Sequence, residues 1–461
     1  MARLQLPVHS YTLRSQPAST ARLVNCYPEA LPADAKTPLV LSRAPGVVSD
    51  VTPGSPIRGL HYAFGQLFAV AGSKLYYLPQ GGSASQRGTI PGTGRVSMAH
   101  NDTYLVVVAE PNAYYTNGTD TVTQISDPDF VSRGAKYVKF MDNYMLFMEP
   151  NSGRFFCADV GTVTDFNALN FATAEAAPDD LVGMEVDHRQ VILFGSETLE
   201  IWDNVGGSGF PFSRALNGVA EIGCFNGDTI AKVDNSVFWL ANDYTIRRLN
   251  GITPVKVSTY AVEDFLSGVD VSTGSAYCYS QNGHSFYVLN FSTGCWVYDV
   301  TSDKWHERAS YPNDYYRWQT HAVAYGQQYV GDAYSDVVGY FDPDVYVESG
   351  STQIMSWTYQ PVYADNRRAF HSRLEVVLET GVGLTSGQGS DPEIMLECSD
   401  DGGRTWRSFP NRRIGRIGEY SWRVVWHALG SARQRVYRMS VSDPVKVVVS
   451  ETTLEVVGGR V

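Results

Sequence analysis

The sequence predicts an all-β protein built around a β-propeller. Its 461 residues include 28 Tyr, 20 Phe and 42 Gly, which is typical of short strands with aromatic surfaces joined by tight turns. A pattern of apolar strand, turn, apolar strand and aromatic strand recurs along the middle of the chain. A four-stranded unit that repeats about every 40 residues indicates propeller blades.

The first blade defines the repeat. Gly65-Gln66 and Gly72-Ser73 supply turns between three runs that are rich in apolar and aromatic residues: 57–64, 67–71 and 74–78. A fourth run, 86–90, ends at Pro91-Gly92. We therefore expect a four-stranded antiparallel meander here.

Similar strand clusters begin near seven residues: Leu60, Val96, Tyr137, Met184, Thr229, Ala276 and His321. Because the clusters share a pattern more than residue identities, they predict six or seven blades of four antiparallel strands. Trp296 and Trp305 are expected to pack across an outer hairpin of a kelch-type blade. Leu199–Asp203 is similar to the third strand of another blade.

Residues 1–56 differ from these repeats. They are rich in Pro and Ala and lack the alternation of apolar and polar residues that marks a half-buried strand. We expect an extended N-terminal arm with little regular structure. Leu23-Val24 and Leu39-Val40-Leu41 are apolar enough to dock, so the arm is expected to lie on the propeller or on a neighbouring copy.

The composition changes near residue 363, where a second, β-sandwich-like domain is expected. Its strands are predicted at 374–378, 394–397, 420–426, 436–441 and 453–457. The predicted division of the chain is therefore an arm over 1–56, a propeller over 57–361 and a sandwich-like domain over 362–461.

The sharpest local motif is SDDGGRTW at 399–406, which matches the Asp-box pattern S-x-D-x-G-x-T-W. The motif favours a tight turn in which a carboxylate accepts backbone N–H bonds and a Trp packs beneath the hairpin. Asp boxes recur in several blades of sialidases, whereas this single copy lies outside the repeats. We expect a structural role for Ser399, Asp401, Gly403, Thr405 and Trp406.

A basic cluster overlaps the Asp box and interleaves Arg with Trp and Phe, as single-stranded nucleic acid binders do. Its members are Arg404, Arg407, Arg412, Arg413 and Arg416. The formal net charge of −12 opposes a tight grip on DNA. We expect a solvated face or a contact patch for an acidic partner.

The sequence predicts no catalytic residues, no metal site and no cofactor. The six Cys are scattered without a CxxC pair, and the nine His form no metal-hydrolase motif. Acidic residues beside Pro are expected to form turns: Asp127, Asp129, Asp179, Asp180, Asp342 and Asp344. Since no run approaches the 18 or so apolar residues of a membrane helix, we expect no membrane insertion.

Three stretches resemble the tail-hub proteins of short-tailed bacteriophages (podoviruses), a family also called packaged-DNA stabilisation or head-completion proteins. They are the arm motifs LVNCYPE at 23–29 and LSRAPGV at 41–47, the first blade with 88–90, and the C-terminal segments 399–406, 422–426, 429–433 and 441–445. On this resemblance, six arm residues are possible partner contacts: Asn25, Tyr27, Pro28, Glu29, Pro45 and Gly46.

The resemblance implies a structural virion protein, without enzymatic activity, that is assembled in the host cytoplasm and resides in the phage tail. In that family a propeller-bearing subunit forms a ring of six below the portal, continues the DNA channel and helps to retain packaged DNA. The implied partners are further copies of the chain, the portal adaptor, tail fibres or tailspikes, a distal needle or nozzle, and double-stranded DNA passing without sequence-specific binding.

Two alternatives remain open from the sequence. A glycan-binding or glycosidase-like propeller, such as a receptor-binding protein, predicts facing carboxylates or stacked aromatic residues on the propeller axis. A generic scaffold propeller predicts a monomer that does not form rings.

Overall fold

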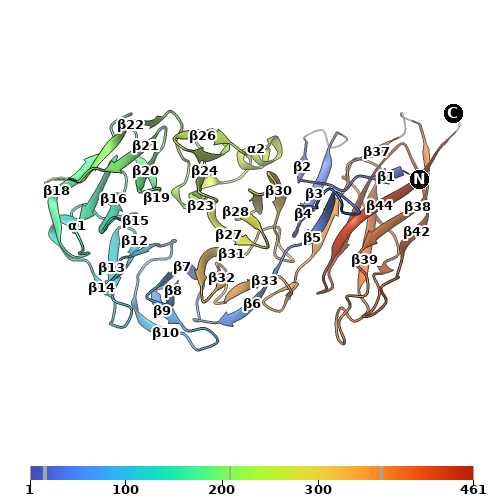
Figure 1. The fold of residues 1–461 in the computed structure, drawn as a ribbon, viewed down its shortest axis with the longest axis horizontal. Coiled ribbons are helices and arrows are strands. Elements are labelled where there is room, and N and C mark those ends of the chain that lie inside the picture. The colour runs from blue at the N-terminus through green and yellow to red at the C-terminus, as the bar shows by residue number, and fades with distance from the viewer. Residues whose placement is uncertain (1, 14–17, 207–208, 364–366, 460–461) are drawn as a thin grey trace.

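The computed structural model describes residues 2–13, 18–206, 209–363 and 367–459, and it is built mainly from β-strands. Within these residues seven four-stranded units surround one axis, and a β-sandwich lies beside them along the long axis of the molecule (Figure 1). The predicted all-β propeller with a C-terminal sandwich is confirmed. The structure settles the blade number, which the sequence left between six and seven, at seven.

Six blades are meanders of consecutive strands. They are β7 (Ile57–Ala63), β8 (Gln66–Ala71), β9 (Lys74–Leu78) and β10 (Ser85–Thr89); β11 (Ser97–His100), β12 (Leu105–Ala109), β13 (Asn112–Thr116) and β14 (Thr123–Gln124); β15 (Tyr137–Met141), β16 (Tyr144–Met148), β17 (Arg154–Ala158) and β18 (Phe166–Thr173); β19 (Leu181–Asp187), β20 (Gln190–Gly195), β21 (Leu199–Asn204) and β22 (Phe212–Ala220); β23 (Ala231–Val233), β24 (Ser236–Leu240), β25 (Ile246–Asn250) and β26 (Thr253–Lys256); and β27 (Ser275–Gln281), β28 (His284–Phe291), β29 (Gly294–Asp299) and β30 (Lys304–Glu307). The expected packing of Trp296 on Trp305 is present across β29 and β30, with ring centroids 6.4 Å apart.

The first two strands of most blades are joined by the same kind of turn. Two residues with positive φ angles connect them at Phe64-Gly65, Asp142-Asn143, His188-Arg189, Asp234-Asn235, Asn282-Gly283 and Tyr325-Gly326. Two successive positive φ angles are typical of a type I′ turn, whose twist matches that of the flanking strands. The turns fix the register so that second strands such as β24 are buried along their whole length.

The seventh blade is completed by the N-terminal segment. Its strands β31 (Trp318–Ala324), β32 (Gln327–Asp332) and β33 (Val338–Asp342) are followed by β6 (Gly46–Val51), which pairs antiparallel with β33. The ring of blades is therefore closed by two segments about 290 residues apart in the sequence. A short hairpin of β34 (Val347–Glu348) and β35 (Ser351–Thr352) extends the same sheet.

The expectation of little regular structure over 1–56 is wrong. Besides β6, this segment forms β1 (Ala2–Leu4), β2 (Tyr11–Thr12), β3 (Thr20–Val24), β4 (Cys26–Ala30) and β5 (Leu39–Arg43). The alternation that would have revealed these strands is missing because consecutive residues are buried, as in Cys26-Tyr27-Pro28. The arm contacts the propeller of its own chain through β6 and β3, and most of its strands belong to the sandwich.

The sandwich is made of two sheets. One contains β4, β5, β44 (Val448–Gly458), β38 (Ala369–Leu378) and β42 (Val424–Ala432), with β1 beside β44; the other contains β3, β36 (Met355–Thr358), β43 (Gln434–Val441), β39 (Glu393–Ser399) and β40 (Arg407–Ser408), with β2, β37 (Val362–Tyr363) and β41 (Arg412–Arg413). The strand predicted at 420–426 begins only at Val424, because the preceding residues form a turn.

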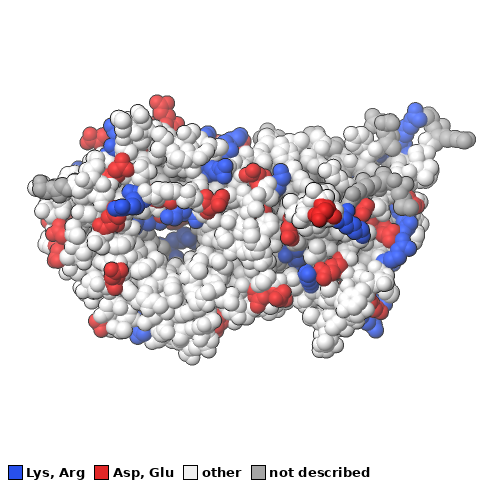
Figure 2. Space-filling view, viewed as in Figure 1, with Lys and Arg blue, Asp and Glu red and all other residues white. Residues whose placement is uncertain are grey.

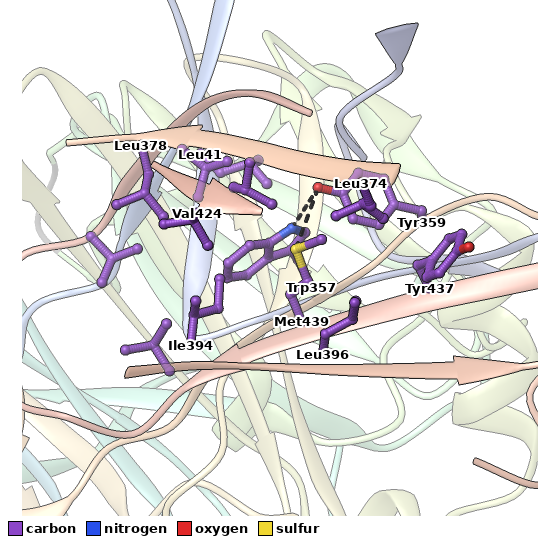
Figure 3. Packing of buried hydrophobic residues seen from close by; sticks show 14 of the residues in the cluster. Leu41, Trp357, Tyr359, Leu374, Leu378, Ile394, Leu396, Val424, Tyr437 and Met439 are labelled. Atoms are coloured by element: carbon purple, nitrogen blue, oxygen red, sulfur yellow. Dashed lines mark hydrogen bonds between the residues drawn. The ribbon is translucent and has the colours of Figure 1, made fainter. Parts of the chain in front are cut away.

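A large apolar cluster fills the space between these sheets (Figure 3). Trp357 lies near its centre, and its indole Nε1 donates a hydrogen bond of 2.9 Å to the Tyr359 hydroxyl, so that the buried polar groups satisfy one another. Leu23 and Leu41 of the arm belong to the same cluster and are fully buried. The sandwich core therefore includes residues from both ends of the chain.

Strand β3 joins the sandwich to the propeller. It pairs antiparallel with β36 of the sandwich and makes one parallel pair, Val24 with Glu307, with β30 of the sixth blade. The boundaries of the domains stay a prediction, and strand pairing crosses them, since β6 lies before residue 57 and β36 before residue 362. Across the residues described, no helix is long and apolar enough to cross a membrane.

Candidate functional site

The Asp box lies in the turn that follows β39, where several donors converge on one carboxylate. Asp401 Oδ1 accepts hydrogen bonds of 2.9 Å from the N–H groups of Arg404 and Thr405. The Ser399 hydroxyl donates to the same oxygen at 2.6 Å and accepts from the Gly403 N–H at 2.7 Å. Hydrogen bonds from the hydroxyls of Ser399 and Thr405 hold the pKa of Asp401 well below its usual range.

Two further residues of the motif complete the turn. Gly403 has a φ of 98°, which favours glycine. The Trp406 indole donates to the Gly403 carbonyl at 3.0 Å, and the Arg438 guanidinium lies 4.0 Å from the centre of the Trp406 ring. Every contact of the Asp401 carboxylate serves to hold the turn, so this geometry is structural. Arg438 comes from β43, and nothing in the Asp-box motif itself indicates this contact.

Asn25 is the most connected of the predicted arm contacts. Its side-chain amide donates to the carbonyls of Ala309 and Ile354 at 2.9 and 2.8 Å, and its side-chain oxygen accepts from the Ala309 N–H at 3.2 Å. The residue is 1% exposed and has a φ of 54°. Asn25 therefore links the arm to the end of the sixth blade and to the segment that leads into the sandwich.

The other arm residues are also engaged within the chain. Tyr27 packs on His284 and Phe286 of the sixth blade, with ring centroids 5.1 and 5.4 Å apart. Pro28, Pro45 and Gly46 are buried, and Glu29 accepts a hydrogen bond of 2.9 Å from the Ser42 hydroxyl. The Pro45 carbonyl accepts from Arg308 and Gln353 at 3.0 Å each. A role of these residues in contacting a partner stays a prediction.

The five residues of the predicted basic patch make different contacts. Arg413 and Arg416 both pair with Asp391, Arg413 also pairs with Glu419, and Arg412 donates to the Val425 carbonyl at 2.9 Å. Much of their charge is therefore compensated locally. Arg404 and Arg407 are exposed, so they retain the ability to meet an acidic partner.

Three of the acidic residues named from the sequence accept hydrogen bonds from backbone N–H groups in turns: Asp127, Asp179 and Asp342. Asp127 caps α1 (Pro128–Val131) by accepting from the N–H groups of Asp129 and Phe130, and Asp179 accepts from those of Glu197 and Thr198. Both carboxylates therefore hold local backbone segments in place. In the part of the chain that the structure describes, no cluster of three or more His, Cys, Asp or Glu could hold a metal ion.

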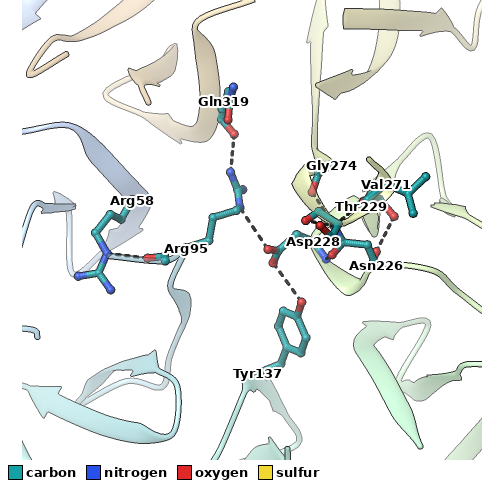
Figure 4. A network of polar contacts seen from close by, with 11 residues as sticks. Arg58, Arg95, Tyr137, Asn226, Asp228, Thr229, Val271, Gly274 and Gln319 are labelled. Carbon is teal, nitrogen blue, oxygen red and sulfur yellow. Dashed lines mark hydrogen bonds and ion pairs between the residues drawn. The ribbon is translucent and has the colours of Figure 1, made fainter. Parts of the chain in front are cut away.

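A polar network at one mouth of the propeller axis has no counterpart among the sequence predictions (Figure 4). Arg95, in the loop before β11, reaches across the mouth and donates to the Gln319 carbonyl of the seventh blade at 3.0 Å. Its Nε lies 3.9 Å from Asp228, which is part of η1 (Gly227–Thr229). The Tyr137 hydroxyl donates to Asp228 at 3.1 Å. Residues from the third and seventh blades, from η1 and from the loop before the second blade therefore meet at this mouth.

Charge is distributed unevenly along the chain. Residues 57–361 contain 17 Lys and Arg against 33 Asp and Glu, whereas residues 362–461 contain 14 against 12. The propeller is therefore strongly acidic and the sandwich slightly basic. In the view of Figure 2, Lys and Arg atoms are nevertheless visible inside the hollow of the propeller.

Two protein families match the chain, and together they cover most of its length. Residues 11–346 match the family described as bacteriophage P22 Gp10, β-propeller, and residues 355–457 match the family described as bacteriophage P22 Gp10, β-sandwich. The chain belongs to the P22 Gp10 family. The two matched segments correspond to the seven-bladed ring with most of its arm and to the sandwich.

A curated relative of this P22 Gp10 family member is the tail hub protein gp10 of Salmonella phage P22, which is 23% identical over 443 residues, covering 89% of this chain and 90% of the relative. Solved structures with a partial likeness include a streptogramin B lyase, at 10% identity and a TM-score of 0.45 over 69% of this chain and 98% of the other. A computationally designed protein, Ika8, matches at 16% identity and a TM-score of 0.41 over 73% of this chain and 100% of the other. Likeness at this level carries no functional implication.

Proposed function

We propose that this chain is a structural subunit of a phage tail hub and that it catalyses no reaction. The observation that carries the proposal is the match to a tail hub protein over 89% of the chain, through both the propeller and the sandwich. The carboxylates of the Asp box and of the other turns agree with a structural role, because they accept hydrogen bonds from backbone N–H groups within turns. The protein would reside in the phage tail after assembly in the host cytoplasm.

The hub would be a ring of about six copies joined by head-to-tail contacts. Two exposed apolar regions favour such contacts, and they lie at opposite ends of the long axis in Figure 1. At the propeller end, Leu169 of β18 is 77% exposed and Leu216 of β22 is 92% exposed. At the sandwich end, Phe370 and Val457 are paired across β38 and β44 and are also exposed.

The unequal charges of the propeller and the sandwich also favour contacts between different copies. The acidic propeller of one copy would meet the slightly basic sandwich of the next, which steers association and disfavours contacts between two propellers. A contact between two different surfaces generates a closed ring when the rotation per copy divides a full turn. The remaining partners would be the portal adaptor, tail fibres or tailspikes, and a distal needle or nozzle.

Double-stranded DNA would pass through the ring without being held. An excess of 16 negative charges over residues 57–361 repels phosphates at long range, and salt screens that repulsion beyond about 10 Å at 0.1 M. A propeller with this excess of negative charge would therefore let DNA slide past it. We assign no sequence-specific contact with DNA to this chain.

The ring interface is tested by sedimentation of the purified protein with Leu216 changed to Glu. A buried charge at this contact should abolish rings and leave folded monomers, because an unpaired charge is costly to desolvate. Ile252→Glu is the matched control, since Ile252 is also exposed, at 47%, but lies in a turn of the fifth blade. Rings that form equally well in both variants would contradict the proposed contact.

A further inference from the structure

The mouth of the propeller axis contains a cavity of about 430 Å³ with an unusual lining for so acidic a propeller. It lies among the first three blades and η1, and three of its lining residues are cations: Arg58, Arg95 and Lys136. The carboxylates that line it are Asp228 and Glu110. Glu110 is exposed, so the interior is left with more positive than negative charge.

Arg58 places a positive charge beneath the cavity without an acidic partner. The residue is 7% exposed, and its guanidinium donates to the carbonyls of Gly94, Gly72 and Ile90 at 2.6, 2.8 and 3.0 Å. Among the described residues no carboxylate forms an ion pair with it. Burial lowers the pKa of Arg58, which reflects the unfavourable desolvation of its charge. An anion nearby would offset that cost.

The Asp228 carboxylate already has partners on both of its oxygens. One carboxylate oxygen accepts from the Tyr137 hydroxyl at 3.1 Å, and the other lies 3.9 Å from Arg95. Burial, and then the charge of Asp228, raise the pKa of Tyr137 well above its usual value, so the phenol keeps the proton that it donates. Asp228 therefore orients Arg95 across the mouth and leaves some of its guanidinium donors free (Figure 4).

The loop that carries Arg95 adds further donors. It reads Pro91-Gly92-Thr93-Gly94, and the N–H groups of Gly92, Thr93 and Gly94 make no hydrogen bond to other described residues. Lys136 lies beside this loop in the cavity lining, with its ammonium 5.8 Å from the centre of the Tyr137 ring. Backbone N–H groups together with Arg and Lys make the donor set that binds phosphate and carboxylate groups.

We propose that this cavity binds a compact oxyanion, a phosphate or carboxylate group, held mainly by Arg95 and Lys136 above the buried Arg58. The anion would complete the charge balance of the cavity and tie the loop before β11 to the third blade. The proposal is independent of the hub function.

Calorimetric titration of the full-length protein with inorganic phosphate, at constant ionic strength, tests this site. The wild type should bind, and both Arg95→Ala and Lys136→Gln should weaken binding at least about tenfold, which corresponds to about 1.4 kcal/mol. Lys74→Gln is the matched control, because it removes one exposed positive charge from the first blade outside the cavity. Circular dichroism establishes that each variant is folded.

A second titration, with triglutamate, separates the two sources of the anion. Competition by triglutamate at lower concentrations than phosphate would assign the site to a carboxylate of an acidic peptide. Weaker competition would assign it to a phosphate group. Two results would overturn the proposal. One is that neither ligand binds at about 10 mM. The other is that the wild type, Arg95→Ala and Lys136→Gln bind with equal affinity.

Discussion

At the scale of single residues, buried polar side chains hold the arm in place. Asn25 has three hydrogen bonds to backbone groups that are 284 and 329 positions away in the sequence, and it has a backbone conformation that few residues adopt. Asn tolerates this conformation better than most other residues, because its short polar side chain can form local hydrogen bonds. One residue therefore combines a backbone requirement with a connection between distant segments.

We expect Asn25→Ala to lower the free energy of unfolding by about 3 kcal/mol, since it leaves buried backbone groups unpaired and strains the backbone. Asn25→Gly removes the same hydrogen bonds but accepts the positive φ, and should cost about 1 kcal/mol less. Chemical denaturation of the three proteins measures both effects. A glycine variant as stable as the wild type would mean that the hydrogen bonds contribute nothing.

His306 makes stability depend on pH. It is 1% exposed, packs on Tyr27 and Phe286, and its Nδ1 has no hydrogen-bond partner among the described residues. Burial lowers the pKa of His306 to about 3. A lowered pKa means that the imidazole must stay neutral in the folded chain, whereas it takes up a proton in the unfolded chain below about pH 6.5. The stability of the fold is therefore lost as the pH falls below that value.

We expect His306→Phe to flatten this dependence. Between pH 7 and pH 5 the wild type should lose about 2 kcal/mol more stability than the variant, because protonation of His306 in the unfolded state no longer contributes. Urea denaturation at the two pH values measures the difference. Identical pH profiles would show that His306 is protonated equally in the folded and unfolded chains.

The Asp box could be predicted residue by residue, because all its hydrogen bonds join neighbours within one turn. The role of Asn25 could not, since nothing in the local sequence indicates partners that are hundreds of residues away. The network of Arg95, Asp228 and Tyr137 was missed for the same reason. Its members come from separate blades and meet only when the propeller closes.

At the scale of elements, two arm strands complete the fold. β6 closes the seventh blade, and β3 joins the sixth blade to the sandwich. Repeated turns and buried second strands made the blades visible in the sequence. The arm strands lacked a period of two because neighbouring residues are buried on both sides, so they read as irregular.

The start of β6 requires a glycine. A Cβ atom at Gly46 would lie 2.2 Å from the Val347 carbonyl oxygen and 2.7 Å from that of Val345, both of which are backbone atoms. We expect Gly46→Ala to cost about 1 to 3 kcal/mol, because the closing strand must shift away from the 345–347 segment, which leads into β34. Denaturant unfolding measures this cost.

Gly94→Ala is the control for this substitution, since a Cβ atom there has nothing within 4 Å and the φ angle is not positive. Its stability should stay within about 1 kcal/mol of the wild type. An equal loss in both variants would contradict the close approach at the start of β6.

At the scale of the whole molecule, the chain has an elongated shape with two different ends. Strands β18 and β22 lie at the propeller end, and β38 and β44 lie at the sandwich end (Figure 1). The first pair carries the exposed Leu169 and Leu216, and the second pair carries the exposed Phe370 and Val457. Because β3 pairs with both parts, we expect them to behave as one body, which fixes the angle between successive copies. A fixed angle is what a closed ring requires.

The mass of the purified protein, alone and mixed with a portal and adaptor complex, is the most direct test of the hub function. Native mass spectrometry should detect a ring of about six copies of the 50.8 kDa chain, either free or formed on the adaptor. A chain that stays monomeric at all concentrations and ignores the adaptor complex would contradict the account.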